Sequence, residues 1–308
     1  MTEIPSTTRE SLALPSGVDA ALLVVALTGI SFSGPLMAAT AAPALAIAFW
    51  RNAMGALPTS GLVAVRRRRE LFAVPPRALA GAGLAGCALA AHFATWVPSV
   101  TLTSVASATA LVSTQMVFTA VIAHGQGRRL PRLAWLGIGV AVVATGLITG
   151  ADVELSGRAV AGDLLAIAGG LFAAIYLSIG ARVRTHMSTA TYTGICYAVC
   201  SGVLLLVCLV GGVPFFGYPA DAWLKIVLVT ICAQLLGHSL LNVVLRSTSP
   251  TVISLAILLE VPGAAIVAYL WLGQHPPLSA IPGLILLVGG LGLVARSRGD
   301  AGPIELTE

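Results

Sequence analysis

Charged residues are scarce in this chain: Asp, Glu, Lys and Arg make up 9% of its 308 residues, whereas apolar residues make up 57%. The interior of a soluble domain cannot bury so large an apolar fraction, so lipid must contact much of the surface. The five cysteines form no C-x-x-C pair and no Cys/His cluster, which argues against disulfides and a metal site. No G-x-x-x-x-G-K-[ST] occurs either, so the chain lacks the usual ATP-binding loop, and we expect no cofactor and no metal.

What the sequence contains is ten apolar runs, each close to the roughly 20 residues that a helix needs to cross the hydrocarbon core of a bilayer. The mean hydropathy is +0.95. The expected fold class is all-α, a polytopic membrane protein with ten transmembrane helices and the lipid bilayer as a partner. Prolines predict tight turns at residues 40–43 and 98–101, because proline disfavours a continuous helix. The predicted spans are 20–40, 43–64, 77–97, 101–123, 132–150, 160–181, 189–211, 222–245, 250–272 and 278–295.

Arginines are distributed unevenly between the two sides that ten spans define. Fourteen fall on the side of the termini, whereas only Arg158 and Lys225 fall on the opposite side. By the positive-inside rule, this bias predicts a multi-pass protein of the bacterial plasma (inner) membrane with both termini in the cytoplasm. The net charge of +5 therefore indicates topology, and no nucleic-acid partner is expected. Glu3, Glu10 and Asp19 make the first residues too polar for a cleavable signal peptide.

The two halves of the chain resemble each other. Gly125-Gln126 and Gly273-Gln274 lie 148 residues apart at the ends of spans 4 and 9, and His92 and His238 lie 146 apart in spans 3 and 8. Because each half has an odd number of spans, the second half enters from the opposite side, and such an inverted repeat places a binding site near the midplane. We predict a cytoplasmic tail (1–19), a first five-helix repeat (20–150), an extracytoplasmic linker (151–159), a second five-helix repeat (160–296) and a cytoplasmic tail (297–308).

Several short motifs resemble the drug/metabolite transporter superfamily, specifically its ten-helix EamA-type members, over residues 20–296. They are Pro43 with Arg51 in span 2, the small-residue segment 103–108, residues 162–166 at the start of span 6 and residues 258–262 in span 9. The chain departs from the family pattern where Gly-Gln replaces Gly-Glu at the ends of spans 4 and 9, and where Glu-Val-Pro replaces the commoner Glu-Pro. The resemblance implies a metabolite exporter, nearest to the aromatic amino-acid exporter type, with spans 1, 3, 4, 6, 8 and 9 contacting the substrate.

An ionisable group at the centre of a bilayer costs about 2.5–3.5 kcal/mol on insertion scales, so its presence needs a reason. Glu260 lies near the middle of span 9, two residues before Pro262, which removes a backbone donor and is a predicted hinge. Glu260 is interpreted either as the partner of a substrate amine or of a coupled proton, or as a structural carboxylate that braces the kink. Pro35, beside Gly34 in the interrupted span 1, is the second predicted hinge.

Span 8 carries Gln234, His238 and Asn242 at i, i+4 and i+8, a polar stripe that must face protein or water if the span is an α-helix. Amide and imidazole groups both donate and accept hydrogen bonds, which suits a zwitterion, although bonding between helices would also explain the stripe. Span 3 adds His92 and Trp96, and Trp96 fits either a site or the aromatic belt at the interface.

Three more polar residues lie inside the spans. Gln115 in span 4 corresponds roughly to the region of Glu260, and the hydroxyl of Tyr176 in span 6 could contact a substrate. Arg51, in span 2, is interpreted either as extending outward to the interface or as binding a substrate carboxylate. The predicted substrate-binding residues are His92, Trp96, Gln115, Tyr176, Gln234, His238, Asn242 and Glu260, and Glu260 is also the candidate for proton coupling.

These features favour a secondary transporter that works as a monomer on a small-molecule substrate and exports amino acids, aromatic ones among them, or related metabolites by alternating access. The alternative within this class is an exporter of lipophilic cations, with Glu260 as the counter-charge and aromatic side chains for cation–π contacts. An enzyme is not expected. An intramembrane serine hydrolase would use Ser31 or Ser33 with a histidine, but the G-x-S-G motif of rhomboid type would need glycine where Ser31 stands.

Overall fold

The structure, a computed structural model, describes residue 15 and residues 17–150, 156–275 and 278–296, and every regular element within them is a helix. The predicted all-α fold class is confirmed. The predicted tail 297–308, most of the tail 1–19 and part of the linker 151–159 lie outside the described residues. The helices are α1 (Gly17–Ser31), α2 (Ser33–Ala38), α3 (Ala44–Arg66), α4 (Arg68–Ala73), α5 (Pro76–Leu102), α6 (Val105–Val112), α7 (Gln115–Gly125), α8 (Arg132–Gly150), α9 (Gly157–Val183), α10 (Thr189–Val210), α11 (Ala220–Val229), the π-helix η1 (Thr230–His238), α12 (Ser239–Val244), α13 (Pro250–Ile257), α14 (Glu260–Leu272), the short 3₁₀ helix η2 (Leu278–Ala280) and α15 (Ile281–Arg296).

These elements form ten helical segments that correspond to the ten predicted spans. Among the described residues, eight segments are long and apolar enough to cross a membrane, and the other two are α3, with 23 residues, and the 16-residue α15. Large apolar side chains stay exposed on the outer faces of the bundle, for example Val24 at 63%, Leu206 at 62% and Ile285 at 68%. Water would make such a surface unfavourable, so the outer faces are suited to lipid.

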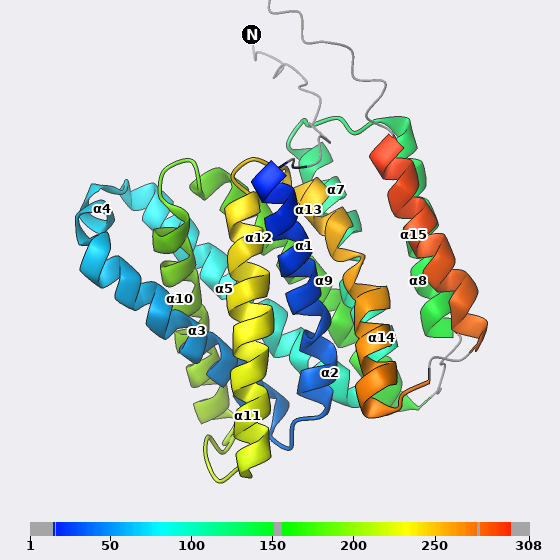
Figure 1. Cartoon of the computed structure of the whole chain (residues 1–308). Helices are drawn as coiled ribbons and strands as arrows, with labels where there is room; N and C mark the ends of the chain where they lie inside the picture. The colour runs from blue at the N-terminus through cyan, green and yellow to red at the C-terminus, as the bar shows by residue number, and fades with distance from the viewer. Residues whose placement is uncertain (1–14, 16, 151–155, 276–277, 297–308) are drawn as a thin grey trace, which may run out of the picture.

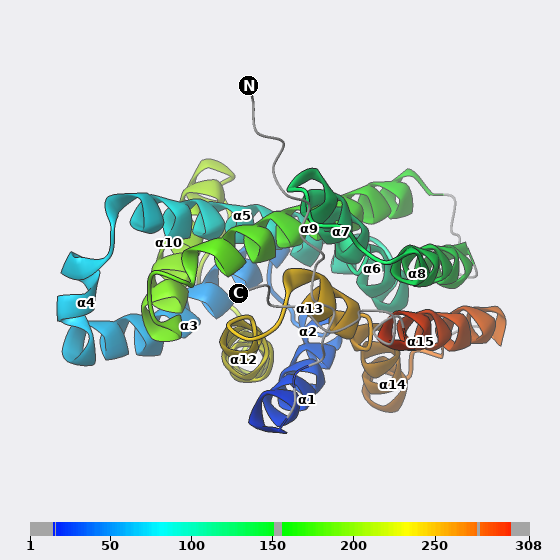
Figure 2. The same ribbon diagram turned by 90° about the horizontal axis from the view of Figure 1, so that it is seen from above.

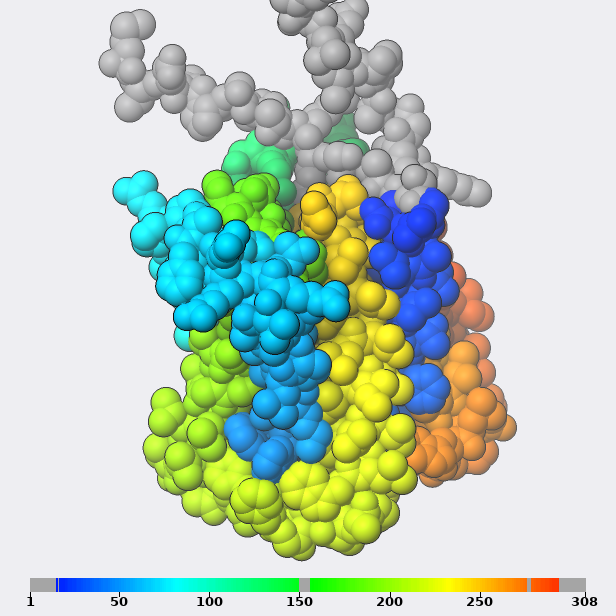
Figure 3. Space-filling model, turned by 60° about the vertical axis from the view of Figure 1, so that its left-hand side comes forward, coloured from blue at the N-terminus to red at the C-terminus, as the bar shows by residue number. Residues whose placement is uncertain are grey.

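The bundle has two distinct ends and two flanks (Figure 1). We name the end where α1 begins and α15 finishes the termini end, and the opposite end the far end. Seen from above, α3, α4 and α10 lie on one flank, and the α8–α15 pair lies on the other (Figure 2). The α3 helix, the span made of α11, η1 and α12, and α1 lie side by side across one face (Figure 3).

The turn predicted at residues 98–101 is wrong, because α5 continues through Pro98 to Leu102. Proline removes one hydrogen bond from a helix interior, here the bond to the carbonyl of Ala94. Side chains add bonds in the turns around Pro98: the hydroxyl of Ser99 donates to the carbonyl of Trp96 (2.6 Å) and that of Thr101 to the carbonyl of Pro98 (2.8 Å). The extra turn and a half of helix keeps Trp96 inside the bundle, 3% exposed, instead of at the membrane interface.

Spans 4 and 9 are each broken at the same point of the repeat. Each begins at a serine N-cap, Ser104 or Ser249, whose hydroxyl accepts a hydrogen bond from the backbone N–H three residues later. Each then has an eight-residue helix (α6 or α13), a two-residue break and a second helix (α7 or α14). In span 9 the break follows from Pro262, which has no N–H, so Val261 donates to Leu258 instead (3.1 Å). The start of α6 and the end of α14 line the same hollow, so the two spans run in opposite directions.

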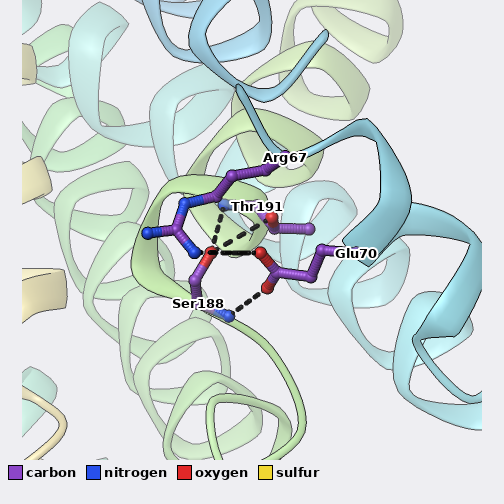
Figure 4. Close-up of polar contacts among 4 residues, drawn as sticks. All are labelled: Arg67, Glu70, Ser188 and Thr191. Atoms are coloured by element: carbon purple, nitrogen blue, oxygen red, sulfur yellow. Dashed lines mark hydrogen bonds and ion pairs between the residues drawn. The ribbon is translucent and has the colours of Figure 1, made fainter. Parts of the chain in front are cut away.

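At the termini end, the short helix α4 connects the two halves (Figure 4). Glu70 of α4 accepts hydrogen bonds from the backbone N–H of Ser188 (2.5 Å), from its hydroxyl (2.9 Å) and from Arg67 (3.2 Å). Ser188 is the N-cap of α10, and its hydroxyl also bonds to Thr191. Partial burial would raise the pKa of Glu70, but the hydrogen bonds from Ser188, Arg67 and Thr191 outweigh it and lower that pKa. The carboxylate therefore holds α4 against α10 in its charged form.

Candidate functional site

A buried cavity lies between the two halves, with walls from spans 1, 3, 4, 6, 8 and 9. The volume available to water is about 40 Å³, which is room for roughly three water molecules. An amino acid does not fit into this volume unless the walls move apart. The lining residues are Ile30, Ser33, Leu89, His92, Trp96, Val112, Gln115, Ala173, Tyr176, Leu177, His238, Leu241, Asn242, Ile257 and Glu260. Seven of the eight predicted substrate-binding residues are in this set.

Residues at equivalent positions of the two halves meet at the cavity. The rings of His92 and His238, 146 residues apart in the sequence, have centroids 6.3 Å apart. Gln115 and Glu260, 145 residues apart, are the first residues of α7 and α14, so the break in each span turns a polar side chain toward the centre. A pseudo-two-fold axis that relates the halves must pass close to these pairs. The cavity therefore lies where an inverted repeat places its binding site.

An aromatic wall forms on α5. His92 and Trp96 are stacked, with ring centroids 5.6 Å apart and planes 14° apart. His92 is held by a hydrogen bond between Nδ1 and the carbonyl of Gly169 (2.9 Å), which leaves Nε2 for another partner. Trp96 Nε1 is buried and has no hydrogen-bond partner among the described residues. This wall offers a flat apolar surface with an indole donor that a ligand can use.

The termini-end side of the cavity is closed by Asn242 and Tyr176. The Asn242 side-chain N–H donates to the Tyr176 hydroxyl (2.6 Å), and Asn242 Oδ1 is buried without a partner in the described part of the chain. Arg184, just beyond α9, donates to the backbone carbonyl of Asn242 and to the hydroxyl of Thr189 (2.5 Å). The ring of Tyr176 stacks on Tyr192 of α10, with centroids 6.3 Å apart. The bonds of Asn242 and Tyr176 thus join span 8 to span 6.

Gln234 does not line the cavity, unlike the rest of the predicted stripe. Its amide donates to Asn52 Oδ1 (2.8 Å) and accepts from Arg51 (3.2 Å), so the side chain points toward α3. The backbone of residues 230–238 is a π-helix, in which each turn takes in an extra residue, so the angle between the Gln234 and His238 side chains differs from that in an α-helix. The carbonyl of Gln234 accepts from the hydroxyls of Tyr197 and Ser239 (both 3.1 Å).

Arg51 lies directly behind the cavity wall. It is fully buried, so the interpretation that it extends outward to the membrane interface is wrong. Its guanidinium donates to Gln234 Oε1 (3.2 Å) and to the hydroxyl of Ser33 (3.1 Å), which lines the cavity, and it lies 4.4 Å from the ring centre of Phe93. Nη2 is buried without a partner in the described residues. The depth of an arginine in a hydrophobic span was the available signal, and the sequence alone left two roles open for it.

The two predicted hinge prolines lie at breaks in spans that line the cavity. Pro35 is in α2, which is separated from α1 by Phe32, and Pro262 is in the first turn of α14. Glycines let these two spans approach closely, because a Cβ at Gly263 would lie 2.2 Å from the hydroxyl of Ser31. The structure thus places both prolines beside the packing contact between spans 1 and 9.

A second hollow opens at the far end, with about 510 Å³ available to water. It is lined from α2, the α5–α6 turn and α14 by Ala38, Val100, Thr101, Thr103, Ser104, Val105, Ala106, Ala265, Ala268, Gln274 and His275. We call this second hollow the vestibule. On α5, Trp96 lines the cavity and Val100 lines the vestibule, and these residues lie four positions or about 6 Å apart along the helix. Little more than one helical turn therefore separates the vestibule from the cavity.

Comparison with known sequences gives one family. The sequence model of the EamA-like transporter family matches the chain twice, over residues 15–150 and 160–296. No curated protein matches the chain. Among solved structures, one described as "Crystal structure of protein" has a TM-score of 0.73 and 15% sequence identity, over 92% of this chain and 99% of the other. At this identity the solved structure supports the shared fold alone.

Proposed function

This chain belongs to the EamA-like transporter family, and we propose that it is a secondary transporter that exports amino acids, aromatic ones among them, or closely related metabolites. The family makes it a membrane transporter of the drug/metabolite type, and the substrate is the part that we infer. The proposed location is the bacterial plasma membrane, with both termini in the cytoplasm, because of the distribution of arginines.

One observation carries the choice of substrate: the cavity brings a single carboxylate, Glu260, together with amides, imidazoles and a stacked His92–Trp96 wall. A carboxylate and the free Oδ1 of Asn242 suit an ammonium group, and the aromatic wall suits an apolar or aromatic side chain. Polar groups inside a bilayer are expensive, and a binding role gives them a reason to be there.

The proposed mechanism is alternating access around this cavity. The breaks in spans 1, 4 and 9 lie beside the site, and short helices on either side of a break can tilt without unfolding a whole span. Because the cavity is too small for an amino acid, substrate binding must widen it. Movement of the two halves against each other would then open the site to one end or the other.

An exporter of lipophilic cations is the second candidate. Glu260 would serve as the counter-charge, and the histidine, tryptophan and tyrosine rings would provide cation–π contacts. A cation would leave the positive charge of Arg51, directly behind Ser33, without compensation from the ligand. We therefore rank this function second.

The test is a flux assay on purified full-length protein in liposomes, with a panel of labelled amino acids and one labelled lipophilic cation, each with and without a pH gradient. We expect saturable flux of particular amino acids. If the transport is coupled to protons through Glu260, Glu260→Gln removes the response to the pH gradient, whereas Glu70→Gln, a carboxylate outside the cavity, keeps it. Flux of the cation with no flux of any amino acid would overturn the proposal and favour the second candidate.

A further inference from the structure

The charges around the cavity come from different halves, and neither is repeated. Arg51 belongs to the first half and Glu260 to the second. The positions 145 residues away, which is the spacing between Gln115 and Glu260, hold Cys196 for Arg51 and Gln115 for Glu260. Cys196 is buried, and its thiol contacts the carbonyl of Ala82 (3.4 Å). The duplicated fold thus carries one cation on one side of its centre and one anion on the other.

Arg51 is fixed in place but not neutralised. One donor is bound by Gln234 and another by Ser33, the thioether of Met37 lies 3.6 Å from Nη1, and the ring of Phe93 covers the guanidinium face. None of the described carboxylates lies within ion-pair distance of it, and Nη2 has no partner there. A buried guanidinium that is held by neutral groups on several sides and keeps one free donor is poised for an anion from elsewhere.

The anion can come from the cavity through Ser33. The Ser33 hydroxyl lines the cavity and accepts from Arg51 Nη1 (3.1 Å), so it can still donate its own proton to a ligand. Ser33 also opens α2 directly after the break in span 1, where the backbone can adjust. If the wall widens beside Ser33, a carboxylate bound there can take the free Nη2 as a second donor.

We propose that Ser33 and Arg51 form the carboxylate subsite for the amino acid, while Glu260 and Asn242 Oδ1 receive its ammonium group. This inference rests on the function proposed above and makes the substrate class narrower: α-amino acids in zwitterionic form, in preference to amines and to carboxylic acids. A bound zwitterion connects the first half, through Arg51, with the second half, through Glu260. Its carboxylate pairs with Arg51 and its ammonium group pairs with Glu260, and both of these side chains lack an ion-pair partner among the described residues.

The experiment compares three ligands that share one side chain: phenylalanine, phenethylamine (which lacks the carboxylate) and 3-phenylpropanoate (which lacks the ammonium). Their binding to the purified full-length protein is measured by calorimetric titration. We expect the wild-type protein to prefer phenylalanine over phenethylamine by about 10- to 100-fold, the range for a charged hydrogen-bonded contact. Arg51→Gln should bring this ratio close to one while the ratio of phenylalanine to phenylpropanoate is retained, and Glu260→Gln should do the reverse.

Two further variants separate recognition from folding. Ser33→Ala keeps the positive charge and should lower the phenylalanine-to-phenethylamine ratio by several-fold, so the inference is testable even if Arg51→Gln does not fold. Arg182→Gln, at an exposed arginine in the last turn of α9 and away from the subsite, is the matched control and should leave the ratio unchanged. If Arg51→Gln and Ser33→Ala keep the wild-type ratio, the carboxylate subsite is wrong while amino-acid transport stands. If wild-type protein binds none of the three ligands and transports no amino acid, the proposed function itself fails.

Discussion

At the termini end of the cavity, Asn242 bonds to Tyr176 (2.6 Å) and Arg184 bonds to the backbone of Asn242, whereas at the far end Gly263 meets Ser31 with no hydrogen bond between the two spans. The termini-end bonds join spans 6 and 8, which both belong to the second half. The far end has polar bonds as well, which lie at its rim and join the two halves. They are the bonds from Lys225 to the carbonyl of Ala39 (2.8 Å) and from Arg158 to that of Thr101 (2.9 Å).

The difference indicates which end opens with less energy. If the termini end opens by moving span 8 away from span 6, the buried bonds of Asn242 must break, and a buried group left unpaired costs about 1–3 kcal/mol. Opening the far end separates close-packed glycine contacts next to a vestibule that water already reaches. We therefore expect the far end to open more readily than the termini end, and the following variants test that expectation from the largest expected effect to the smallest.

Gly263→Val should have the largest effect, because it prevents spans 1 and 9 from closing. Its Cβ would lie 2.2 Å from the Ser31 hydroxyl, so a backbone must move, and overpacking of this kind costs about 1–3 kcal/mol. We expect substrate flux in liposomes to fall by about tenfold or more. Gly289→Val is the matched control, since a Cβ there meets nothing within 4 Å. Wild-type flux in Gly263→Val would show that the contact plays no part in closure.

Arg184→Gln should make the termini end easier to open. The variant loses the charged bonds to Asn242 and Thr189, together worth about 1.5–3 kcal/mol. In a background without the five native cysteines, Leu177→Cys should then react several-fold faster with a membrane-impermeant thiol reagent added at the termini end. The rate with reagent added at the far end serves as the control. An unchanged rate at the termini end would mean that Arg184 does not hold that end closed.

Tyr176→Phe should have a smaller effect at the same end. It deletes the acceptor of the Asn242 amide while leaving the aromatic ring stacked near Tyr192. The loss of one hydrogen bond is about 1 kcal/mol, so we expect KM for the transported amino acid to rise by about fivefold with little change in maximal rate. Phe93→Tyr is not a suitable control, because Phe93 contacts Arg51. Tyr269→Phe, on the outer part of α14, is the matched control.

Glu70→Gln should have the smallest effect, and one that depends on pH. Because the hydrogen bonds lower the pKa of Glu70 in the folded protein, its stabilisation is complete above the ordinary glutamate pKa of 4.5 and is lost as pH falls through the lowered value. At neutral pH we expect the variant to unfold at a slightly lower temperature, equivalent to about 1 kcal/mol. Melting curves of the two proteins should converge in strong acid. A difference that stays constant with pH would contradict the role of the carboxylate.

The sequence was a good guide to the positions of the spans and to most residues of the cavity. Isolated polar groups in apolar helices, such as His92, Gln115 and Glu260, need partners away from lipid, and that requirement alone directs them to the centre. The repeat strengthened the prediction, because residues at equivalent positions of an inverted repeat approach its axis. Both arguments depend on periodicity and polarity, which can be read directly from a sequence.

The features that were predicted wrongly or left open depend on local backbone and side-chain geometry, which cannot be read directly from the sequence. The α5 helix continues past Pro98, where side-chain hydroxyls add hydrogen bonds in the turns around the proline. Gln234 was predicted in the cavity by α-helical spacing, which the π-helix changes. The role of Arg51 could not be chosen from depth alone, because an arginine side chain is long enough to reach either the interface or the core.

The π-helix η1 lies in a part of the second half (residues 189–238) that is one residue longer than the corresponding part of the first half (residues 44–92). Ala44 and Thr189, the first residues of α3 and α10, lie 145 residues apart. The spacing is 146 between His92 and His238, and it returns to 145 between the serine caps Ser104 and Ser249. The π-helix accommodates this insertion without a loop in the middle of the membrane.

Deleting a single residue from η1, such as Leu235, would restore regular α-helical hydrogen bonding and would rotate one part of the span by about 100° relative to the other. Either the bonds of Gln234 to Asn52 and Arg51 or the position of His238 and Asn242 in the cavity would then be lost. A regular α-helix would thus be the worse membrane span for this protein. The irregular π-helical turn lets Gln234 face α3 while His238 and Asn242 face the cavity.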